Sequence, residues 1–218
     1  MHYLKNLTLL LFCSAIISCT GNKKQNDTAT QEQAESTASE APAEVPAIKK
    51  YQIKSGIVTF YNEGMGIKSK VVLYFDDYGM KEAEEKYDGE TIKDATLCDG
   101  KNRYIIVYKE KAAYESGECF RGVAYKFDWS EIERAPEQYK GKKLPNVTIA
   151  GKDCESYSIQ SGKSPIVYAG WNNICMMIDQ ESSFGKITYK AVSIEENATI
   201  PEGKLTIPEG FVVKKSPM

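Results

Sequence analysis

The sequence predicts a single, mainly β domain whose strands form an antiparallel sheet, accompanied by one short helix. From residue 51 onward, segments rich in Val, Ile, Tyr and Phe recur, and turns of hairpin length separate them. Connectors this short join antiparallel neighbours. The expected strands are residues 52–61, 69–76, 103–108, 121–127, 154–159, 166–171, 174–179 and 187–194.

Apolar residues occupy every second position in several of these segments, as in a strand with one buried face. Val71, Leu73 and Phe75 are one such set, but Val72 and Tyr74 are the residues between them. A sheet that is apolar on much of both faces is either covered on both sides or curved around something.

Three further segments complete the expected fold. A short helix is expected at Ser130, which is spaced from Glu133 as in a capping box, and Pro136 limits its length. This helix either acts as a lid or plug or simply caps one end of the sheet. The charged run 81–86 is expected to form an exposed strand or an irregular helix. Residues 197–211 are expected to form a strand pair in which a repeated Ile-Pro-Glu-Gly makes two similar turns.

The N-terminus predicts export and lipidation. His2 and Lys5 give a short positive start, and an apolar run over 7–17, too short to span a bilayer, leads to a serine and Cys19. This ending resembles the bacterial lipobox, in which a small residue precedes a cysteine that is diacylated and becomes the mature N-terminus. Residues 1–18 are therefore the expected signal peptide, and Cys19 is the expected lipidation site. The alternative is an ordinary secretory signal with an incidental cysteine.

Residues 19–50 are expected to be a disordered tether. They are rich in Ala, Thr, Ser, Glu, Gln and Pro, so they cannot bury enough apolar surface to offset the entropy of ordering. About thirty such residues span roughly 30 Å as a coil, which lets the expected domain, residues 51–215, stand clear of a membrane. Asp27-Thr28-Ala29 resembles the short sequon that Bacteroidetes use for protein O-glycosylation, so Thr28 is the expected sugar acceptor.

The composition argues against several function classes. Removing residues 1–18 removes one lysine and changes the formal charge from −2 to −3, and no basic cluster exceeds two adjacent lysines. A nucleic-acid partner is therefore not expected. The only histidine, His2, leaves with the signal peptide, which excludes Ser-His-Asp and Cys-His mechanisms and His-ligated zinc. Catalysis by carboxylates alone is compatible with the composition, but no motif spacing identifies a particular pair of acidic residues. The chain is predicted to be non-enzymatic, without cofactor or metal site.

The exported N-terminus, about ten strands and one mid-chain helix resemble the lipoprotein-carrier fold, the LolA/LolB-like half-barrel. The resemblance also rests on Tyr51–Gly56, Leu73–Gly79, Asp99-Gly100 and the ending from Asn197 to Gly210. It is strongest to a Bacteroidetes group of small LolA-like lipoproteins of unassigned function. The resemblance implies a curved antiparallel half-barrel whose concave apolar face, partly filled by helices, accepts acyl chains.

The residues that match this concave face define the expected ligand site. They are Leu73, Phe75, Tyr125, Phe127, Trp129, Trp171 and Met176. The leading prediction is a lipid-anchored envelope protein that binds an acyl chain or a lipidated polypeptide there. Since an apolar stripe on a strand more often forms core than a pocket, the alternative is an interaction module with a self-filled core that recognises another envelope protein. The expected location is the periplasmic face of the outer membrane, because Cys19 is not followed by the acidic run that resembles the Bacteroidetes surface-export signal.

The cysteines of the domain are even in number, which in an oxidising compartment predicts disulfides. They are Cys98, Cys119, Cys154 and Cys175. Cys98 and Cys119 flank a hairpin with its turn near 109–111, so this pairing is favoured, and Cys154–Cys175 follows by elimination. The turn near 161–162 would, however, place Cys154 nearer Trp171. A cysteine metal site lacks the Cys-x-x-Cys spacing.

Overall fold

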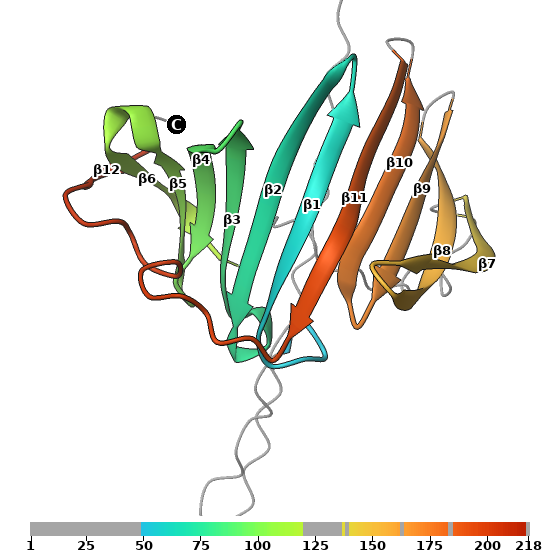
Figure 1. Cartoon of the computed structure of the whole chain (residues 1–218), viewed down its shortest axis with the longest axis horizontal. Helices are drawn as coiled ribbons and strands as arrows, with labels where there is room; N and C mark the ends of the chain where they lie inside the picture. The colour runs from blue at the N-terminus through green and yellow to red at the C-terminus, as the bar shows by residue number, and fades with distance from the viewer. Residues whose placement is uncertain (1–48, 120–136, 138–139, 162–163, 183–184, 217–218) are drawn as a thin grey trace, which may run out of the picture. The chain divides into compact units, whose positions relative to one another are not determined.

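The structure, a computed structural model, describes residues 49–119, 137, 140–161, 164–182 and 185–216. These residues form one open, curved sheet of twelve strands, a half-barrel (Figure 1). The strands are β1 (Gly56–Gly64), β2 (Ile67–Asp76), β3 (Lys81–Asp88), β4 (Thr91–Cys98), β5 (Asn102–Val107), β6 (Ala112–Glu118), β7 (Gly141–Ile149), β8 (Lys152–Ser161), β9 (Ser164–Trp171), β10 (Ile174–Ser182), β11 (Gly185–Glu196) and β12 (Val212–Lys215). Two 3₁₀ turns, η1 (Asp77–Gly79) and η2 (Tyr108–Glu110), follow β2 and β5.

The sheet grows outward from its centre in two directions. Its strand order is β12-β6-β5-β4-β3-β2-β1-β11-β10-β9-β8-β7. From β1 the chain moves by hairpins to β6, then resumes at the far edge with β7 and returns by hairpins to β11, beside β1. Every neighbouring pair is antiparallel except β12 and β6, so the expected antiparallel sheet is confirmed.

Seven of the expected strands are confirmed, as β1, β2, β5, β8, β9, β10 and β11. The expected strand at 121–127 and the expected helix at Ser130 lie outside the described residues. Strands β4, β6, β7 and β12 were not among the expected strands. β4 and β6 contain Ala, Lys, Asp, Glu or Gly, residues that are depleted in strands.

The charged run 81–86 forms β3, but the expectation that it is exposed is wrong. Glu82, Glu84 and Glu85 are 4%, 6% and 3% exposed. β3 lies between β2 and β4 in the interior of the sheet, and the carboxylates of Glu82 and Glu85 are each paired with a lysine from a distant segment.

The expected strand pair in 197–211 is also wrong, whereas its two similar turns are confirmed. Neither half of this segment pairs as a strand, and only β12 after it joins the sheet. The N–H groups of Lys204 and Phe211 donate to the carbonyls of Pro201 and Pro208, each at 3.2 Å. The glycine before each donor has a positive φ, as position three of a type II turn requires. Proline has no N–H to donate to a neighbouring strand, which favours turns over strands in this segment.

The sheet buries opposite faces in its two halves. Val58 opposes Leu73 and Phe60 opposes Val71, so these side chains share one face, which we call the first face. They belong to the large core. Its other buried members are Tyr51, Phe75, Ile149, Cys154, Ala169, Ile174, Met176 and Ala191.

The small core lies on the other side of β3–β6, which we call the second face. Glu84 opposes Leu73 on the first face, so its neighbour Ala83 points to the second face. The buried members of the small core are Ala83, Ala95, Leu97, Tyr104, Ile106 and Ala113. Residues 197–211, which we call the strap, run from the end of β11 past the ends of the strands to β12 (Figure 1). Leu205, Ile207 and Phe211 of the strap pack against the small core.

Strand β2 joins the two cores, because it is buried on both faces. All five residues from Val71 to Phe75 are buried. Leu73 enters the large core, while Tyr74 opposes Ala83 of the small core. Of the two alternatives given for a sheet that is apolar on both faces, covered on both sides or curved around something, the first holds for β2. Among the described residues, no helix is long and apolar enough to cross a membrane.

Candidate functional site

The structure brings the described members of the expected ligand site together. Leu73, Phe75 and Met176 are 1%, 0% and 0% exposed and all lie in the large core, and Trp171 packs against that core. The other expected ligand residues, Tyr125, Phe127 and Trp129, lie outside the described residues, as do Cys19 and Thr28. The residues chosen from the sequence therefore form core where the structure describes them.

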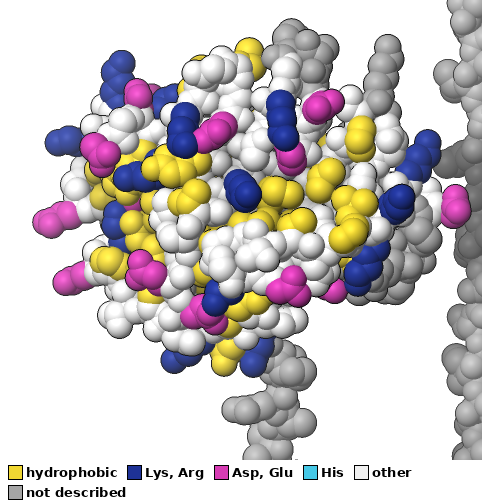
Figure 2. Space-filling model, turned by 45° about the vertical axis from the view of Figure 1, so that its right-hand side comes forward, with side chains coloured by type: hydrophobic (Ala, Val, Ile, Leu, Met, Phe, Trp, Pro, Cys, Tyr) yellow, Lys and Arg dark blue, Asp and Glu magenta, His cyan; other side chains and the backbone are white. Residues whose placement is uncertain are grey.

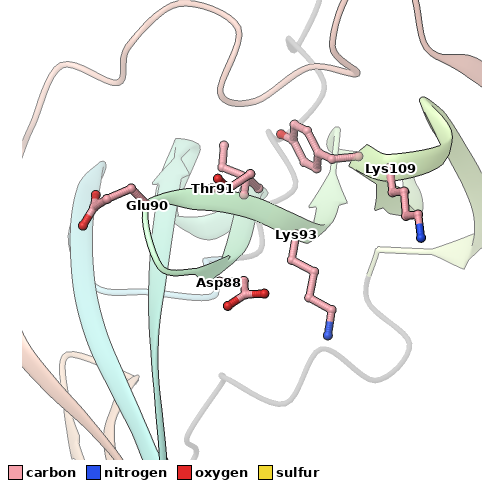
Figure 3. A pocket seen from close by; sticks show the side chains of 7 residues that line it. Asp88, Glu90, Thr91, Lys93 and Lys109 are labelled. Carbon is pink, nitrogen blue, oxygen red and sulfur yellow. The ribbon is translucent and has the colours of Figure 1, made fainter.

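Two hollows on the described surface lie elsewhere. One, of about 820 Å³, lies at the β3–β4 turn and η2. Figure 3 shows the acidic groups of Asp88 and Glu90 and the amines of Lys93 and Lys109 spread around it rather than converging on a point. Within the described ranges, no group of three or more His, Cys, Asp or Glu residues could hold a metal ion.

A second hollow, of about 590 Å³, lies at the tip of the β1–β2 hairpin. Here Met65 and Ile67 are 68% and 71% exposed, and Ile187 of the neighbouring strand is 37% exposed. We call these three side chains the apolar tip. Lys68 beside them is paired with Glu63 at 2.5 Å. Elsewhere, Figure 2 shows charged side chains of both signs interspersed with hydrophobic ones on the face that it presents.

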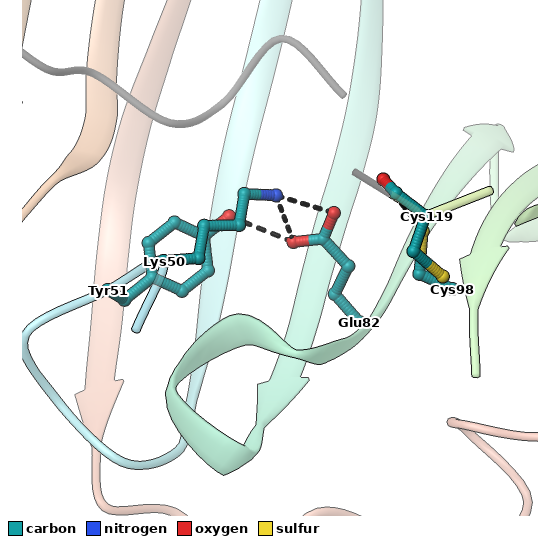
Figure 4. Close-up of polar contacts among 5 residues, drawn as sticks. All are labelled: Lys50, Tyr51, Glu82, Cys98 and Cys119. Carbon is teal, nitrogen blue, oxygen red and sulfur yellow. Dashed lines mark hydrogen bonds and ion pairs between the residues drawn. The ribbon is translucent and has the colours of Figure 1, made fainter. Parts of the chain in front are cut away.

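A buried polar network marks the start of the domain. The Nζ of Lys50 lies 2.6 Å from Oε1 and 2.5 Å from Oε2 of Glu82, with side chains 9% and 6% exposed. The hydroxyl of Tyr51 donates to the same carboxylate at 3.0 Å. Figure 4 shows the three side chains converging, with Cys98 and Cys119 beyond Glu82. We call Lys50, Tyr51 and Glu82 the junction network, because it lies where the expected tether enters the sheet.

The backbone holds the junction network in place. The N–H groups of Lys50 and Tyr51 both donate to the carbonyl of Tyr78, at 3.0 and 2.9 Å. A Cβ on Gly79 would lie 2.5 Å from the Tyr51 ring, so only glycine permits this close approach. The ring meets Phe75 edge to face, with centroids 4.8 Å apart. Burial, and then the charge of Glu82, raise the pKa of Tyr51, so its hydroxyl stays a donor.

Sequence reasoning missed the junction network because its members are separated by 32 residues, and no periodic pattern links them. The sequence alone places Lys50 at the end of the expected tether and Glu82 in a charged run expected to be exposed. The acidic residue opposite Phe75 can be recognised only once the register of β2 and β3 is known, and the sequence alone does not give this register.

The four cysteines are free thiols in the structure, so the disulfides remain predictions. The expected hairpin between Cys98 and Cys119 is confirmed, with its turn at η2. The Cys98 thiol donates to the carbonyl of Cys119 at 3.7 Å. Cys154, by contrast, lies next to the pair Glu155–Gly170, so it is opposite Trp171 as expected, and β9 separates it from Cys175 on β10.

Comparisons with known proteins concern the fold. No family model matches the sequence, and no curated protein matches it. An uncharacterized conserved protein from Thermus thermophilus superimposes with a TM-score of 0.52 at 10% identity, over 76% of this chain and 92% of that chain. A chain of the Pseudomonas aeruginosa MucA/MucB complex superimposes with a TM-score of 0.46 at 14% identity, over 72% of this chain and 56% of that chain. A putative outer membrane lipoprotein-sorting protein domain from Vibrio parahaemolyticus superimposes with a TM-score of 0.33 at 9% identity, over 70% of this chain and 89% of that chain. The first match shows that this curved sheet recurs in another protein.

Proposed function

We propose that this protein is a lipid-anchored envelope protein of the LolA-like type whose half-barrel is an interaction module for another envelope protein. The observation that carries the proposal is the burial of Leu73, Phe75 and Met176, none more than 1% exposed. These residues fill the site that an acyl chain would occupy. A protein whose concavity is filled by its own side chains recognises a partner with its surface.

The lipid anchor and the subcellular location are part of the same proposal. Cys19 carries the acyl chains, residues 19–50 act as the tether, and Thr28 carries a sugar if the host has the matching glycosylation system. The expected location is the periplasmic face of the outer membrane. The LolA-like half-barrel and the lack of a catalytic motif in the sequence support a binding role rather than an enzymatic one.

The apolar tip is the surface that we assign to the partner. Exposed apolar side chains gathered at one place mark interaction sites more often than isolated ones do. Met65 and Ile67 are the two most exposed large apolar residues in the described part of the chain. The flanking pair Lys68–Glu63 gives the tip a polar rim, as protein interfaces have.

The second candidate function is binding of an acyl chain or a lipidated polypeptide. It is favoured by the composition of the large core, which gathers side chains from several strands and Tyr51 on one curved sheet. An acyl chain could fill this site if some of these side chains moved aside.

Native mass spectrometry distinguishes the two functions. The chain from residue 20 onward is exported to a periplasm and purified without detergent. A mass equal to that of the polypeptide supports the interaction module. A reproducible excess mass that organic solvent removes, and that fragments as lipid, supports the carrier instead.

Photo-crosslinking tests the assigned surface. A crosslinker placed at Lys68 should capture one envelope protein in whole cells, and M65S/I67S should lower the captured amount about tenfold, as expected for loss of central interface side chains. The matched control is V212S/V213S on β12, where the side chains are 60% and 53% exposed. Equal capture by both variants would show that the partner does not bind the apolar tip.

A further inference from the structure

We infer that Cys98 and Cys119 form the one disulfide of this domain, and that Cys154 and Cys175 remain thiols. This divides the four cysteines into a covalent pair beside the junction network and two buried, unreacted residues. The inference rests on the envelope location proposed above, because an oxidising compartment is needed, but not on the identity of any partner.

The chain path brings Cys119 over the end of the β4–β5 hairpin. Residue Arg103 opposes Gly117 and Tyr104 opposes Glu115, so β6 has one extra residue, a bulge that bends the strand. Gly117 has a φ of 116°, which favours glycine at this bend. After the bend, the N–H of Cys119 donates to the carbonyl of Lys101 in the hairpin turn at 3.1 Å.

The turn itself is fixed by its own side chain. Oδ1 of Asp99 accepts from the N–H groups of Lys101 and Asn102 at 2.8 and 2.7 Å. The Cys119 thiol donates to the carbonyl of Asn102 at 3.1 Å, while the Cys98 thiol donates to the carbonyl of Cys119 at 3.7 Å. Both thiols therefore lie at the same hairpin end, and Figure 4 shows the two residues together.

The other two cysteines are held apart by the sheet. Neighbouring strands are about 4.8 Å apart, so residues on β8 and β10 are about 10 Å apart across β9. Disulfides need Cα atoms no more than about 7 Å apart. Each thiol also has its own backbone acceptor, Lys152 for Cys154 at 3.6 Å and Met177 for Cys175 at 3.5 Å. The Cys154–Cys175 pairing expected by elimination would require β9 to leave the sheet.

The chemistry is a thiol–disulfide exchange. The two thiols lose two protons and two electrons as the Sγ–Sγ bond forms, and a disulfide of a thiol-oxidising envelope protein takes them up and becomes a dithiol. Burial raises the pKa of the Cys98 thiol well above its ordinary value, so little thiolate is present once the domain is folded. The bond is therefore expected to form during folding rather than afterwards.

The bridge would connect the junction network with the end of β6. Cys98 opposes Glu82 of the junction network across the β3–β4 pair, and Cys119 directly follows β6. Closing the bond fixes the end of β6 to the strand next to the one that holds the start of the domain. The entry point of the tether and the exit from β6 then share one rigid edge.

Peptide mapping of the full chain tests the inference. The protein is exported by its own signal to an oxidising envelope, unfolded with N-ethylmaleimide to block free thiols, and digested before and after reduction. We expect Cys154 and Cys175 to be alkylated without reduction, and one digestion product that contains both Cys98 and Cys119 and separates on reduction. Alkylation of all four residues without reduction, or a bridge between any other pair, would overturn the inference.

Two variants sharpen the test. C154S/C175S should keep the bridged product, because neither residue contributes to it. C98S should leave Cys119 fully alkylated without reduction and should not create a bridge to Cys154 or Cys175. Because the wild-type map stands alone, a variant that fails to fold does not weaken the test.

Discussion

The large core and the small core are built on one sheet, yet they bury opposite faces and use different side chains. The large core fills the first face with long apolar residues such as Phe60 and Phe75 and has only Tyr51 from outside the strands among its buried members. The small core contains three alanines and is covered by the strap. Alanine side chains fill little space, so Leu205, Ile207 and Phe211 of the strap complete the small core.

β2 and β3 are both buried on both faces, but the first face changes from apolar to acidic between them. Glu82 opposes Phe75, so the first face becomes acidic directly beside the large core. On β4, Thr96 and Asp94 continue this polar surface opposite Glu84 and Lys86. The first face is therefore apolar over only part of the half-barrel, which limits the length of any apolar ligand that it could hold. Lys50 neutralises the carboxylate nearest to the core.

The largest effect is expected from breaking the junction network. Lys50→Met leaves the Glu82 carboxylate buried without its cation, which should lower the free energy of unfolding by about 3–5 kcal/mol. Urea denaturation measures this loss. K50M/E82M removes both charges and should recover most of the stability. If the double variant is as unstable as the single one, the loss does not come from an uncompensated charge on Glu82.

The matched control is an ion pair on the surface. Lys68 and Glu63 have side chains 58% and 53% exposed. Solvent screens such pairs, so Lys68→Met should leave the urea midpoint unchanged. A loss as large as that of K50M would mean that burial does not separate the two pairs.

The next largest loss of stability is expected from the same substitution, Leu→Ala, made once in each core. Leu73 and Leu97 are each 1% exposed, one in the large core and one in the small core. Leu→Ala should cost about 4–5 kcal/mol at Leu73 and about 2–3 kcal/mol at Leu97, because the cost depends on how far the surroundings can collapse. The strap is not fixed by a strand ladder and can move into the space, whereas β1 and β2 cannot. Equal losses would show that the strap is as rigid as the sheet.

These cores also show what the sequence could predict. Alternation of Val71, Leu73 and Phe75 was enough to place β2 and its first face, since strand period and core membership coincide there. β3 could not be recognised as buried, because its carboxylates become acceptable only through cations far away in the chain. Lys204, the partner of Glu85 at 2.7 Å, is separated from it by 119 residues. A local window cannot contain that information.

The candidate site, too, could be predicted from the sequence only in part. Leu73, Phe75 and Met176 could be selected because apolar stripes are visible in the sequence, and the structure places them together in the large core. Whether such a stripe forms a pocket or a core depends on what packs against it, which no periodicity encodes. The bulge at Gly117, which brings Cys119 toward Cys98, is likewise a property of the paired strands rather than of either strand alone.

A smaller effect is expected in the strap. The ring of Phe211 meets Tyr108 edge to face, with centroids 5.3 Å apart, and packs on the small core. Phe211→Ala should lower stability by about 1–2 kcal/mol, since this side chain is only partly buried. Hydrogen exchange should accelerate in β4–β6 and stay unchanged in β1 and β10, because local opening follows the lost contacts. Val213→Ala, a change at a side chain 53% exposed, is the control. Uniform acceleration would show that the two cores unfold as one.

The last prediction is a loss of stability that is absent at neutral pH and increases at alkaline pH. Burial raises the pKa of Cys154 to about 11 and that of Cys175 to about 12. In the unfolded chain a thiol ionises near pH ~8.5. Above that pH the unfolded state releases protons that the folded state keeps, so stability should be constant up to about pH 8 and fall as the pH rises toward about 12. Tyr51, whose pKa burial also raises, adds to the loss above about pH 10. Urea midpoints measured from about pH 7 to about pH 11 test this, and Cys175→Ala should make the decline shallower. A decline in Cys175→Ala as steep as that of the unchanged protein would contradict the assignment of the alkaline effect to this thiol.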